Sequence, residues 1–304
     1  MIGQIYKGYE IVEKIKDGSI GTVWKATNSK GQAFAVKQLS QKNAARPEKI
    51  KQFKKEATLT AKLQHRNIIK VHDYVDSTGA LPCFIMEYFE SENLKYAMWH
   101  LPDRVNSHEF HILRQVADAL NYIHSQGIIH KDLKPENVLI NERSEIRLID
   151  FSLGQNKMDR LLQFSRRVEG TPLYMAPEQI QGLKCDARTD IYAFGVLTYE
   201  LLTKRPPFLG TTEKNLLEKH CSEAPRPMRE LVKTLSPDLD LFVQKMLAKK
   251  RENRFQDMAT VLVELSKWEK KDTVIRLRQV EPAKPRAKEA EKAGSAEEAE
   301  EAGA

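Results

Sequence analysis

The residues with the clearest chemical potential lie in one short stretch of the sequence. Asp132 is followed five positions later by Asn137, and a second aspartate, Asp150, comes after a short apolar segment. A carboxylate that can accept a proton, together with further oxygen groups that can bind magnesium, is what phosphoryl transfer from a metal-bound nucleotide requires. Lys134 lies between the first two residues, and its charge suits a phosphate group. The spacing therefore indicates phosphoryl-transfer chemistry.

These residues belong to two longer motifs, HKDLKPEN at 130–137 and DFS at 150–152. Both resemble motifs of the eukaryotic-type (Hanks-type) serine/threonine protein kinases, and the similarity runs from about residue 9 to about residue 265. The resemblance implies the roles that the family gives to these positions. Asp132 would receive the proton of an attacking hydroxyl, and Lys134 would lie beside the transferred phosphate. Asn137 and Asp150 would bind Mg²⁺.

The same resemblance implies a binding site for ATP. Gly18 and Gly21 match two of the family's three loop glycines, while Lys16 stands at the position of the first. Lys37 matches the lysine that holds the α- and β-phosphates, and Glu56 matches its glutamate partner. The family pattern places seven further residues around the nucleotide: Ile15, Val23, Ala35, Met86, Glu87, Phe89 and Leu139. Taken singly, a glycine turn, a solvated lysine or plain core packing explains each of these residues at least as well.

Several contacts outside the nucleotide site are also implied by the resemblance. Glu178, in the segment APE at 176–178, would form a buried ion pair with Arg254. Asp190 would accept backbone amides of the catalytic loop, and Thr171 would hydrogen-bond near that loop. Ser165, which two arginines follow, is the candidate phosphorylation site, and a solvated loop serine is the alternative interpretation.

Three residues depart from the family pattern. Lys16 replaces a glycine, Lys131 replaces the usual arginine and loses its bidentate geometry, and Ser152 replaces a glycine. All three affect mobility or regulation and leave the predicted metal ligands intact. The leading hypothesis is a serine/threonine protein kinase that transfers the γ-phosphoryl of Mg-ATP to protein hydroxyls. The alternatives are a pseudokinase that acts as a nucleotide-binding scaffold, and a small-molecule phosphotransferase, which the segment 176–178 disfavours.

The elements that must position these residues fall into two regions. Before residue 89, alternating patterns predict strands at 9–15, 21–27, 33–37, 68–74 and 83–88, with one helix at 50–63. After it, helical spacing dominates: one helix is expected to start with Ser107 as its N-cap, and others cover 187–202, 239–247 and 255–265. The resemblance therefore implies an α+β, two-lobed protein-kinase fold, with a small β-rich N-lobe and a larger, mostly helical C-lobe.

The expected domain organisation follows the same change in pattern. An N-terminal extension covers 1–8, and the kinase domain covers 9–268, with the N-lobe at about 9–86, the hinge at about 87–91 and the C-lobe at about 92–268. The segment 269–304 contains Pro282, Pro285 and many Ala, Glu and Lys residues. Because it has almost no apolar residues, we expect a disordered tail, through which a partner could dock, or the start of a linker.

Composition limits the remaining function classes. The 304 residues are 41% hydrophobic and 30% charged, with a net charge of +7. No apolar run approaches the ~18 residues of a membrane span, and the N-terminus lacks a signal-peptide core. The sequence has no basic block interleaved with aromatic residues, so we do not expect nucleic-acid binding. The three cysteines have no metal-ligand spacing, so we expect reduced thiols and a cytoplasmic protein. The family resemblance implies that its partners are protein substrates with Ser or Thr.

Overall fold

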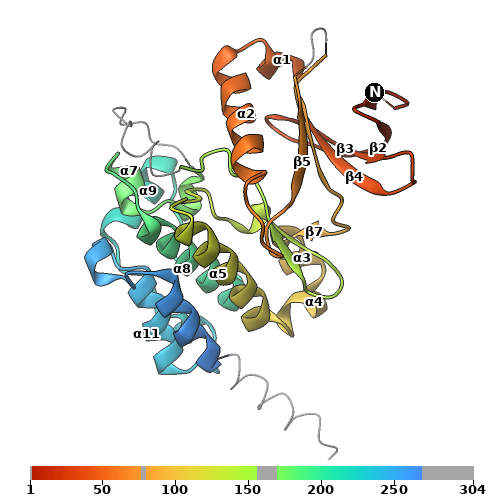
Figure 1. Ribbon diagram of the computed structural model, residues 1–304. Helices are drawn as coiled ribbons and strands as arrows, with labels where there is room; N and C mark the ends of the chain where they lie inside the picture. Colours follow the sequence, from red (N-terminus) through yellow and green to blue (C-terminus); the bar gives the residue numbers. More distant parts are fainter. Residues whose placement is uncertain (1, 77–79, 156–169, 269–304) are drawn as a thin grey trace, which may run out of the picture.

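The computed structural model describes residues 2–76, 80–155 and 170–268, which form two lobes (Figure 1). The first lobe is built around a sheet, and the second consists mainly of helices. The predicted α+β, two-lobed architecture is therefore confirmed. Among the described residues, no helix has both the length and the apolar character needed to cross a membrane.

The N-lobe sheet has six antiparallel strands in the order β1-β2-β3-β4-β6-β5. Their bounds are Ile5–Tyr6 (β1), Tyr9–Asp17 (β2), Gly21–Thr27 (β3), Ala33–Leu39 (β4), Val71–Val75 (β5) and Cys83–Glu87 (β6). The turn between β3 and β4 is closed by Asn28, whose side-chain oxygen accepts the amides of Lys30 and Gln32, each at 3.0 Å. The expected extension contributes β1, which pairs with the start of β2.

Helix α2 (Pro47–Thr60) packs on this sheet and carries Glu56. Proline at the first helical position is favoured because its missing amide hydrogen has no partner there in any case. The helix buries Phe53 and Ala57 in a small core with Leu39, Val71 and Phe84 of the strands. This packing fixes the helix face from which Glu56 points toward β4. A single additional turn, α1 (Gln41–Ala44), precedes α2 and is capped by the Ser40 side chain.

The C-lobe is organised around α8 (Ala187–Thr203), which is buried along nearly its whole length. Its neighbours in contact are α5 (Glu109–Ser125) and α11 (Pro237–Met246) (Figure 1). The shorter helices are α3 (Leu94–His100), α4 (Pro102–Asn106), α7 (Pro177–Ile180), α9 (Glu213–Ser222) and α10 (Met228–Leu231), with 3-10 turns η1 (Pro135–Asn137), η2 (Pro172–Tyr174) and η3 (Arg251–Asn253). A last helix covers 258–268.

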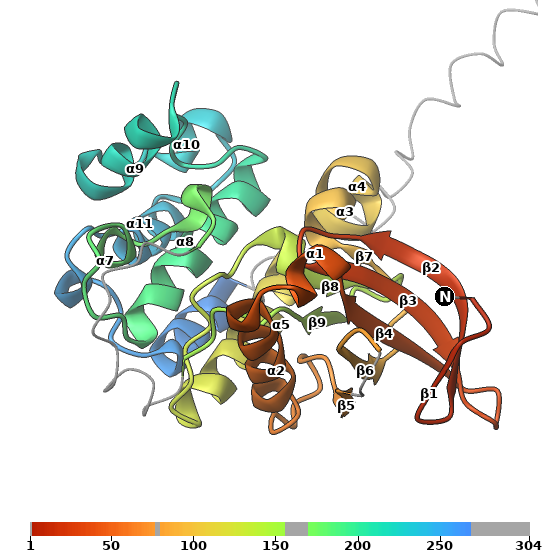
Figure 2. The ribbon, with the colours of Figure 1, turned by 90° about the horizontal axis from the view of Figure 1, so that it is seen from above.

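A small three-stranded sheet lies at the junction of the lobes (Figure 2). Its strands are β7 (Glu92–Asn93), β8 (Val138–Ile140) and β9 (Ile146–Leu148). The segment before β5 runs along this sheet: Leu148 donates its amide to the Asn67 carbonyl at 2.8 Å, and Ile68 forms a parallel bridge with Leu148. The strand predicted at 68–74 therefore starts only at Val71, because Ile68 pairs with the C-lobe instead.

Two predicted helix starts are wrong. Ser107 is not the N-cap of α5, because Pro102 starts a short helix of its own and Ser107 closes that helix. Helix α5 begins after His108 without a side-chain cap. The last helix starts at 258, where Asp257 accepts the Thr260 amide at 2.7 Å. Phe255 precedes it and packs against Phe242, with ring centroids 5.4 Å apart.

Candidate active site

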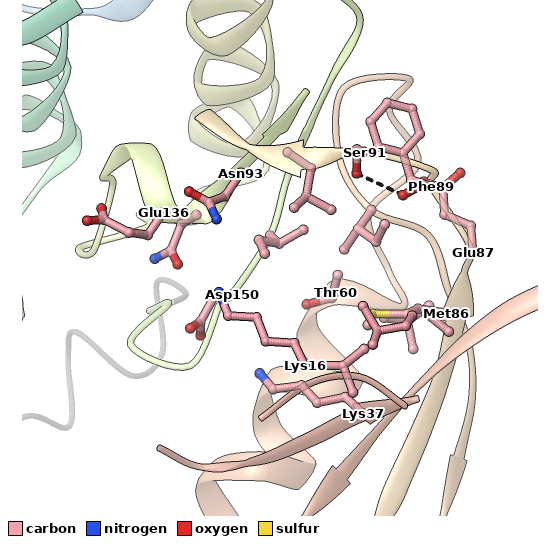
Figure 3. A pocket seen from close by; sticks show the side chains of 18 of the residues that line it. Lys16, Lys37, Thr60, Met86, Glu87, Phe89, Ser91, Asn93, Glu136 and Asp150 are labelled. Atoms are coloured by element: carbon pink, nitrogen blue, oxygen red, sulfur yellow. Dashed lines mark hydrogen bonds between the residues drawn. The ribbon is translucent and has the colours of Figure 1, made fainter. Parts of the chain in front are cut away.

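A cavity of about 600 Å³ separates the N-lobe sheet from the junction sheet (Figure 3). This volume lies within the range of small-molecule and cofactor sites. The predicted adenine-binding residues all line it: Ile15, Val23, Ala35, Met86, Glu87, Phe89 and Leu139. So do the predicted phosphate and metal residues Lys37, Glu56, Lys134, Asn137 and Asp150, together with Thr171. The cavity thus has an apolar end at the lobe connection and a charged end at the catalytic loop.

Lys37 and Glu56 form an ion pair at this charged end. Lys37 points from β4 into the cavity, and its Nζ lies 2.7 Å from Oε1 of Glu56. Burial alone would lower the pKa of Lys37, but the carboxylates of Glu56 and Asp150 raise it above its ordinary value. The lysine is therefore a stable cation held in place by α2, as phosphate binding requires.

Asp150 points into the same end of the cavity (Figure 3). Its backbone has φ +65°, and its Oδ1 accepts the Ser152 amide at 3.2 Å. The next residue, Phe151, is fully buried and packs against the His130 ring, with centroids 4.8 Å apart. Burial raises the pKa of Asp150, but Lys37, the Ser152 contact and His130 together hold it below its ordinary value. The residue is thus kept as a carboxylate, the form that binds a metal ion.

The catalytic loop, residues 130–137, is held together by hydrogen bonds around Asp132. Its Oδ1 accepts the backbone amide of Thr171 at 3.0 Å and the Thr171 hydroxyl at 2.8 Å. Its Oδ2 lies 2.9 Å from the Lys134 ammonium, which also donates to the Thr171 hydroxyl at 2.6 Å. Asn137 donates through Nδ2 to the Asp132 carbonyl at 2.8 Å. Four of the predicted residues therefore share one hydrogen-bonded network.

Asp190 of α8 binds this loop through hydrogen bonds from the loop backbone. Its carboxylate accepts the backbone amides of His130 at 2.8 Å and of Lys131 at 2.9 Å, as the sequence predicts, and it also contacts Nε2 of His124 at 2.8 Å. Lys131 has φ +69°, a conformation that costs free energy in a residue with a Cβ. The two amide contacts stabilise this strained turn, which sets the direction of Asp132.

Glu178 and Arg254 lie further from the cavity and form a bidentate pair. The two guanidinium nitrogens lie 2.8 Å and 2.9 Å from the carboxylate oxygens, and the Arg254 side chain is fully buried. The Thr189 hydroxyl also donates to Glu178, and Arg254 donates to the carbonyls of Ala248 and Lys249. These contacts fix α7 and the chain before it on the C-lobe.

The two predicted loop glycines are not among the residues that line the cavity. Gly18 donates its amide to the Gly21 carbonyl at 2.8 Å in the turn between β2 and β3. A Cβ on Gly21 would lie only 1.8 Å from the carbonyl oxygen of Gln38. In this structure, Gly21 is therefore required by the close approach of two strands. The predicted phosphosite Ser165 and the predicted tail 269–304 lie outside the described residues.

Residues that sequence analysis did not assign to nucleotide binding also line the cavity, among them Lys16, Ile69, Val71, Phe84, Glu136 and Ile149. A further unpredicted contact joins the lobe connection to β9: Arg147 Nε donates to Glu87 at 3.0 Å, and its guanidinium lies 4.4 Å from the Phe89 ring centroid. Sequence periodicity gives no signal for such a pair. A position at the cavity could have been predicted for Ile149, because it directly precedes Asp150 in the sequence.

The donor set at the charged end fits Mg²⁺. Magnesium prefers hard oxygen ligands and is commonly bound by one or two protein groups together with phosphate oxygens. Asp150 supplies a carboxylate, and the Nδ2 contact of Asn137 leaves its Oδ1 as the second oxygen. Within the described ranges there is no cluster of three or more His, Cys, Asp and Glu residues that could hold a metal without such phosphates.

The chain is similar to known proteins over most of its length. The family model described as "Protein kinase domain" matches residues 9–264. Similar proteins include a probable serine/threonine-protein kinase of Clostridium acetobutylicum (32% identity, 88% of this chain and 41% of the relative), PknB of Mycobacterium leprae (34%, 76% and 38%) and pkn2 of Myxococcus xanthus (35%, 82% and 31%), the last two also named as serine/threonine-protein kinases. The chain thus spans less than half the length of these relatives. By the family model, which matches most of its length, the chain belongs to the protein kinases.

Proposed function

We propose that this protein transfers the γ-phosphoryl group of Mg-ATP to Ser and Thr hydroxyls of other proteins. The observation that carries the proposal is the meeting of two sets of residues at one cavity. Asp132, Lys134 and Asn137 form a single hydrogen-bonded network, and Lys37 and Asp150 point into the same charged end. A nucleotide phosphate bound there would lie near Lys37 and Lys134 and close to the proton acceptor, Asp132.

The contacts of Asp132 support its role as the proton acceptor. Thr171 occupies Oδ1 and Lys134 approaches Oδ2, so the carboxylate is held in one orientation. An incoming substrate hydroxyl would give its proton to this carboxylate while its oxygen attacks the γ-phosphorus. Lys134 lies beside the same carboxylate, where its charge would offset the negative charge on the transferred group.

Nucleotide binding divides between the two ends of the cavity. The side chains of Val23, Ala35 and Leu139 would enclose the adenine ring, and the backbone at Glu87 and Phe89 would hydrogen-bond its edge. At the other end Lys37 would contact the α- and β-phosphates. Asn137 and Asp150 would hold Mg²⁺, which supplies positive charge to the β- and γ-phosphates when bound.

The substrate class is proposed from the relatives and from the chain around α7. The relatives are named as serine/threonine-protein kinases. The Glu178–Arg254 pair gives the segment after Thr171 a fixed platform on which a polypeptide can lie. No observation favours the pseudokinase alternative, since Ser152 still donates its amide to Asp150 and Lys131 still donates its amide to Asp190.

We propose that the partners are protein substrates, that the protein binds no nucleic acid, and that the tail 269–304 is a docking segment for a partner. A cytoplasmic location fits both the use of ATP and the three cysteines, Cys83, Cys185 and Cys221, which are free thiols as expected in a reducing compartment.

The experiment is a transfer assay with γ-labelled ATP and Mg²⁺, with and without a generic basic protein substrate. We expect label on Ser and Thr with the wild type, and a loss of about a hundredfold or more in Asp132→Asn, because general-base catalysis contributes at least that factor. Asp103→Asn is the matched control: Asp103 is an exposed aspartate on α4 away from the cavity and should leave the rate unchanged. A wild type that binds Mg-ATP but transfers no label to any protein, itself included, would contradict the proposal.

A further inference from the structure

Lys16 and Lys37 lie in one row across three adjacent strands. In the register of the sheet, Lys16 is paired with Val23 on β3, and Val23 is paired in turn with Lys37 on β4. Residues directly opposite each other in antiparallel strands point to the same face of the sheet. Since neighbouring strands are about 4.8 Å apart, the two lysine backbones are about 10 Å apart, on the face that lines the cavity.

A break in the strand register explains why both Ile15 and Lys16 line the cavity. Consecutive side chains of a regular strand point to opposite faces. The pairing of β2 with β3 shifts between Lys14 and Lys16, which is the signature of a bulge. Such an extra residue redirects the side chains that follow it. Figure 3 shows Lys16 at the cavity with Lys37 and Asp150.

The three lysines that line the cavity differ in their partners. Lys37 is paired with Glu56, and Lys134 is paired with Asp132. The Lys16 side chain has no ion pair or hydrogen bond with any part of the chain that the structure describes, while its backbone pairs with β3. Its nearest acidic neighbour in the strand, Asp17, is already held by Lys14 and Thr22. Lys16 therefore brings a positive charge to the cavity that no described carboxylate neutralises.

We propose that Lys16 is a phosphate-binding residue for the nucleotide. Its ammonium would contact the phosphates from the β2 side, while Lys37 contacts them from the β4 side. A lysine ammonium carries three donors on a long flexible stem, which suits a phosphate that is reached across an open cavity edge. The charged side chain of Lys16 would in this way give the loop a phosphate contact that a glycine at this position has no side chain to make. This inference rests on the proposed function, because it needs a nucleotide in the cavity.

The test compares the dissociation constants of ATP and adenosine, measured by calorimetry with Mg²⁺ at one ionic strength. We expect Lys16→Met to weaken ATP binding about fivefold to tenfold, the lower end of what a charge-assisted hydrogen bond contributes. Adenosine binding should be unchanged, because adenosine has no phosphate. Lys16→Arg should restore most of the ATP affinity. Lys30→Met is the matched control, because Lys30 is an exposed lysine in the turn after β3. This substitution removes the same charge and should change neither dissociation constant.

Three outcomes would overturn the proposal. Equal weakening of ATP and adenosine in Lys16→Met would assign Lys16 a packing role only. Tighter ATP binding in Lys16→Met would show that the side chain obstructs the cavity. If Lys16→Met and Lys30→Met weakened ATP binding equally, then Lys16 would act only through long-range electrostatic attraction and not through a contact with the phosphates. A wild type that binds no ATP at all would instead reject the proposed function together with this inference, so the two failures are distinguishable.

Discussion

Asp150 is the proposed ligand of Mg²⁺, and its pKa is set by the charged and polar groups around it. Its carboxylate is largely buried, and yet its pKa is held below the ordinary value by Lys37, the Ser152 contact and His130, which outweigh the effect of burial. The residue therefore stays ionised throughout the neutral and mildly acidic range. A carboxylate of this kind would need no change of protonation in order to bind Mg²⁺, as proposed for Asp150.

We predict that Asp150→Asn removes most of the Mg²⁺ dependence of ATP binding. The affinity gained on adding Mg²⁺ should fall by at least about tenfold, since even the loss of an outer-shell partner of a metal costs that much. In the wild type, Asp150 itself should add no pH dependence to the Mg²⁺ effect between about pH 8 and about pH 5, because the lowered pKa keeps the carboxylate charged. Calorimetric titrations with and without Mg²⁺ measure both quantities. A Mg²⁺ effect that survives in Asp150→Asn would move the metal site elsewhere.

Among the elements, α7 and α8 carry the buried charges that hold the catalytic loop and the segment after Thr171. Arg254 is fully buried as a side chain and is bound to both carboxylate oxygens of Glu178. Removing one partner of such a pair leaves an uncompensated charge in the interior. We predict that Arg254→Met lowers the free energy of unfolding by about 3–5 kcal/mol.

The control for this prediction is Arg226→Met, which makes the same substitution in an exposed pair. Arg226 contacts Glu230 at 2.7 Å, but both side chains are more than half exposed. Surface pairs of this kind contribute less than about 1 kcal/mol. Urea denaturation followed by circular dichroism gives both values. Similar losses in the two variants would mean that burial does not decide the contribution of Arg254.

Asp190, near the start of α8, makes the fold sensitive to acid. Burial raises its pKa, but His124 and His130, whose amide it accepts, hold it below its ordinary value of 3.8. Because the unfolded chain then binds the proton more readily, this carboxylate stabilises the fold above about pH 4 and loses that contribution as the pH falls through the lower folded pKa.

We therefore predict that Asp190→Asn lowers the free energy of unfolding by about 2–4 kcal/mol near neutral pH, because the buried amides lose a charged acceptor. The difference from the wild type should shrink below about pH 4, where the wild type loses the same contribution. Urea denaturation at a series of pH values checks this convergence. A difference that does not depend on pH would assign the effect to shape and not to charge.

Local sequence patterns are sufficient to predict some of these elements and not others. The α+β division follows from periodicity. The bounds of α8 follow from its strongly apolar composition, because a helix that is buried on every side is apolar on every side. The start of α5 does not, since Pro102 begins a separate helix and turns Ser107 into its C-terminal residue. Residues with family motifs, such as Glu178 and Arg254, could be paired in advance. Lys16 could not be placed from sequence alone, because a strand bulge sets its direction.

At the scale of the whole molecule, the described contacts between the lobes are concentrated at the junction sheet. Asn67 lies before β5 and donates its side-chain amide to Gln115 of α5 at 2.9 Å, while its backbone pairs with Leu148 of β9. Glu87, at the end of β6, receives Arg147 of β9 at 3.0 Å. Both connections join residues far apart in the sequence, which is why no local pattern predicted them. They fix the edge of the cavity where we propose that adenine binds.

We predict that Arg147→Met loosens this edge and raises the KM for ATP about threefold to tenfold, corresponding to about 1 kcal/mol of lost positioning. The reason is that Glu87 and Phe89, whose backbone would hold adenine, would lose their contact with the C-lobe. The unfolding free energy should change by less than about 1 kcal/mol, because the Arg147 and Glu87 side chains are partly exposed, at 20% and 28%. Steady-state kinetics and denaturation measure the two effects separately. Arg104→Met, which breaks a 3.7 Å pair with Glu142 on the C-lobe, is the matched control and should leave KM unchanged. If KM is also unchanged in Arg147→Met, then the segment around Asn67 is sufficient to hold the lobes in register.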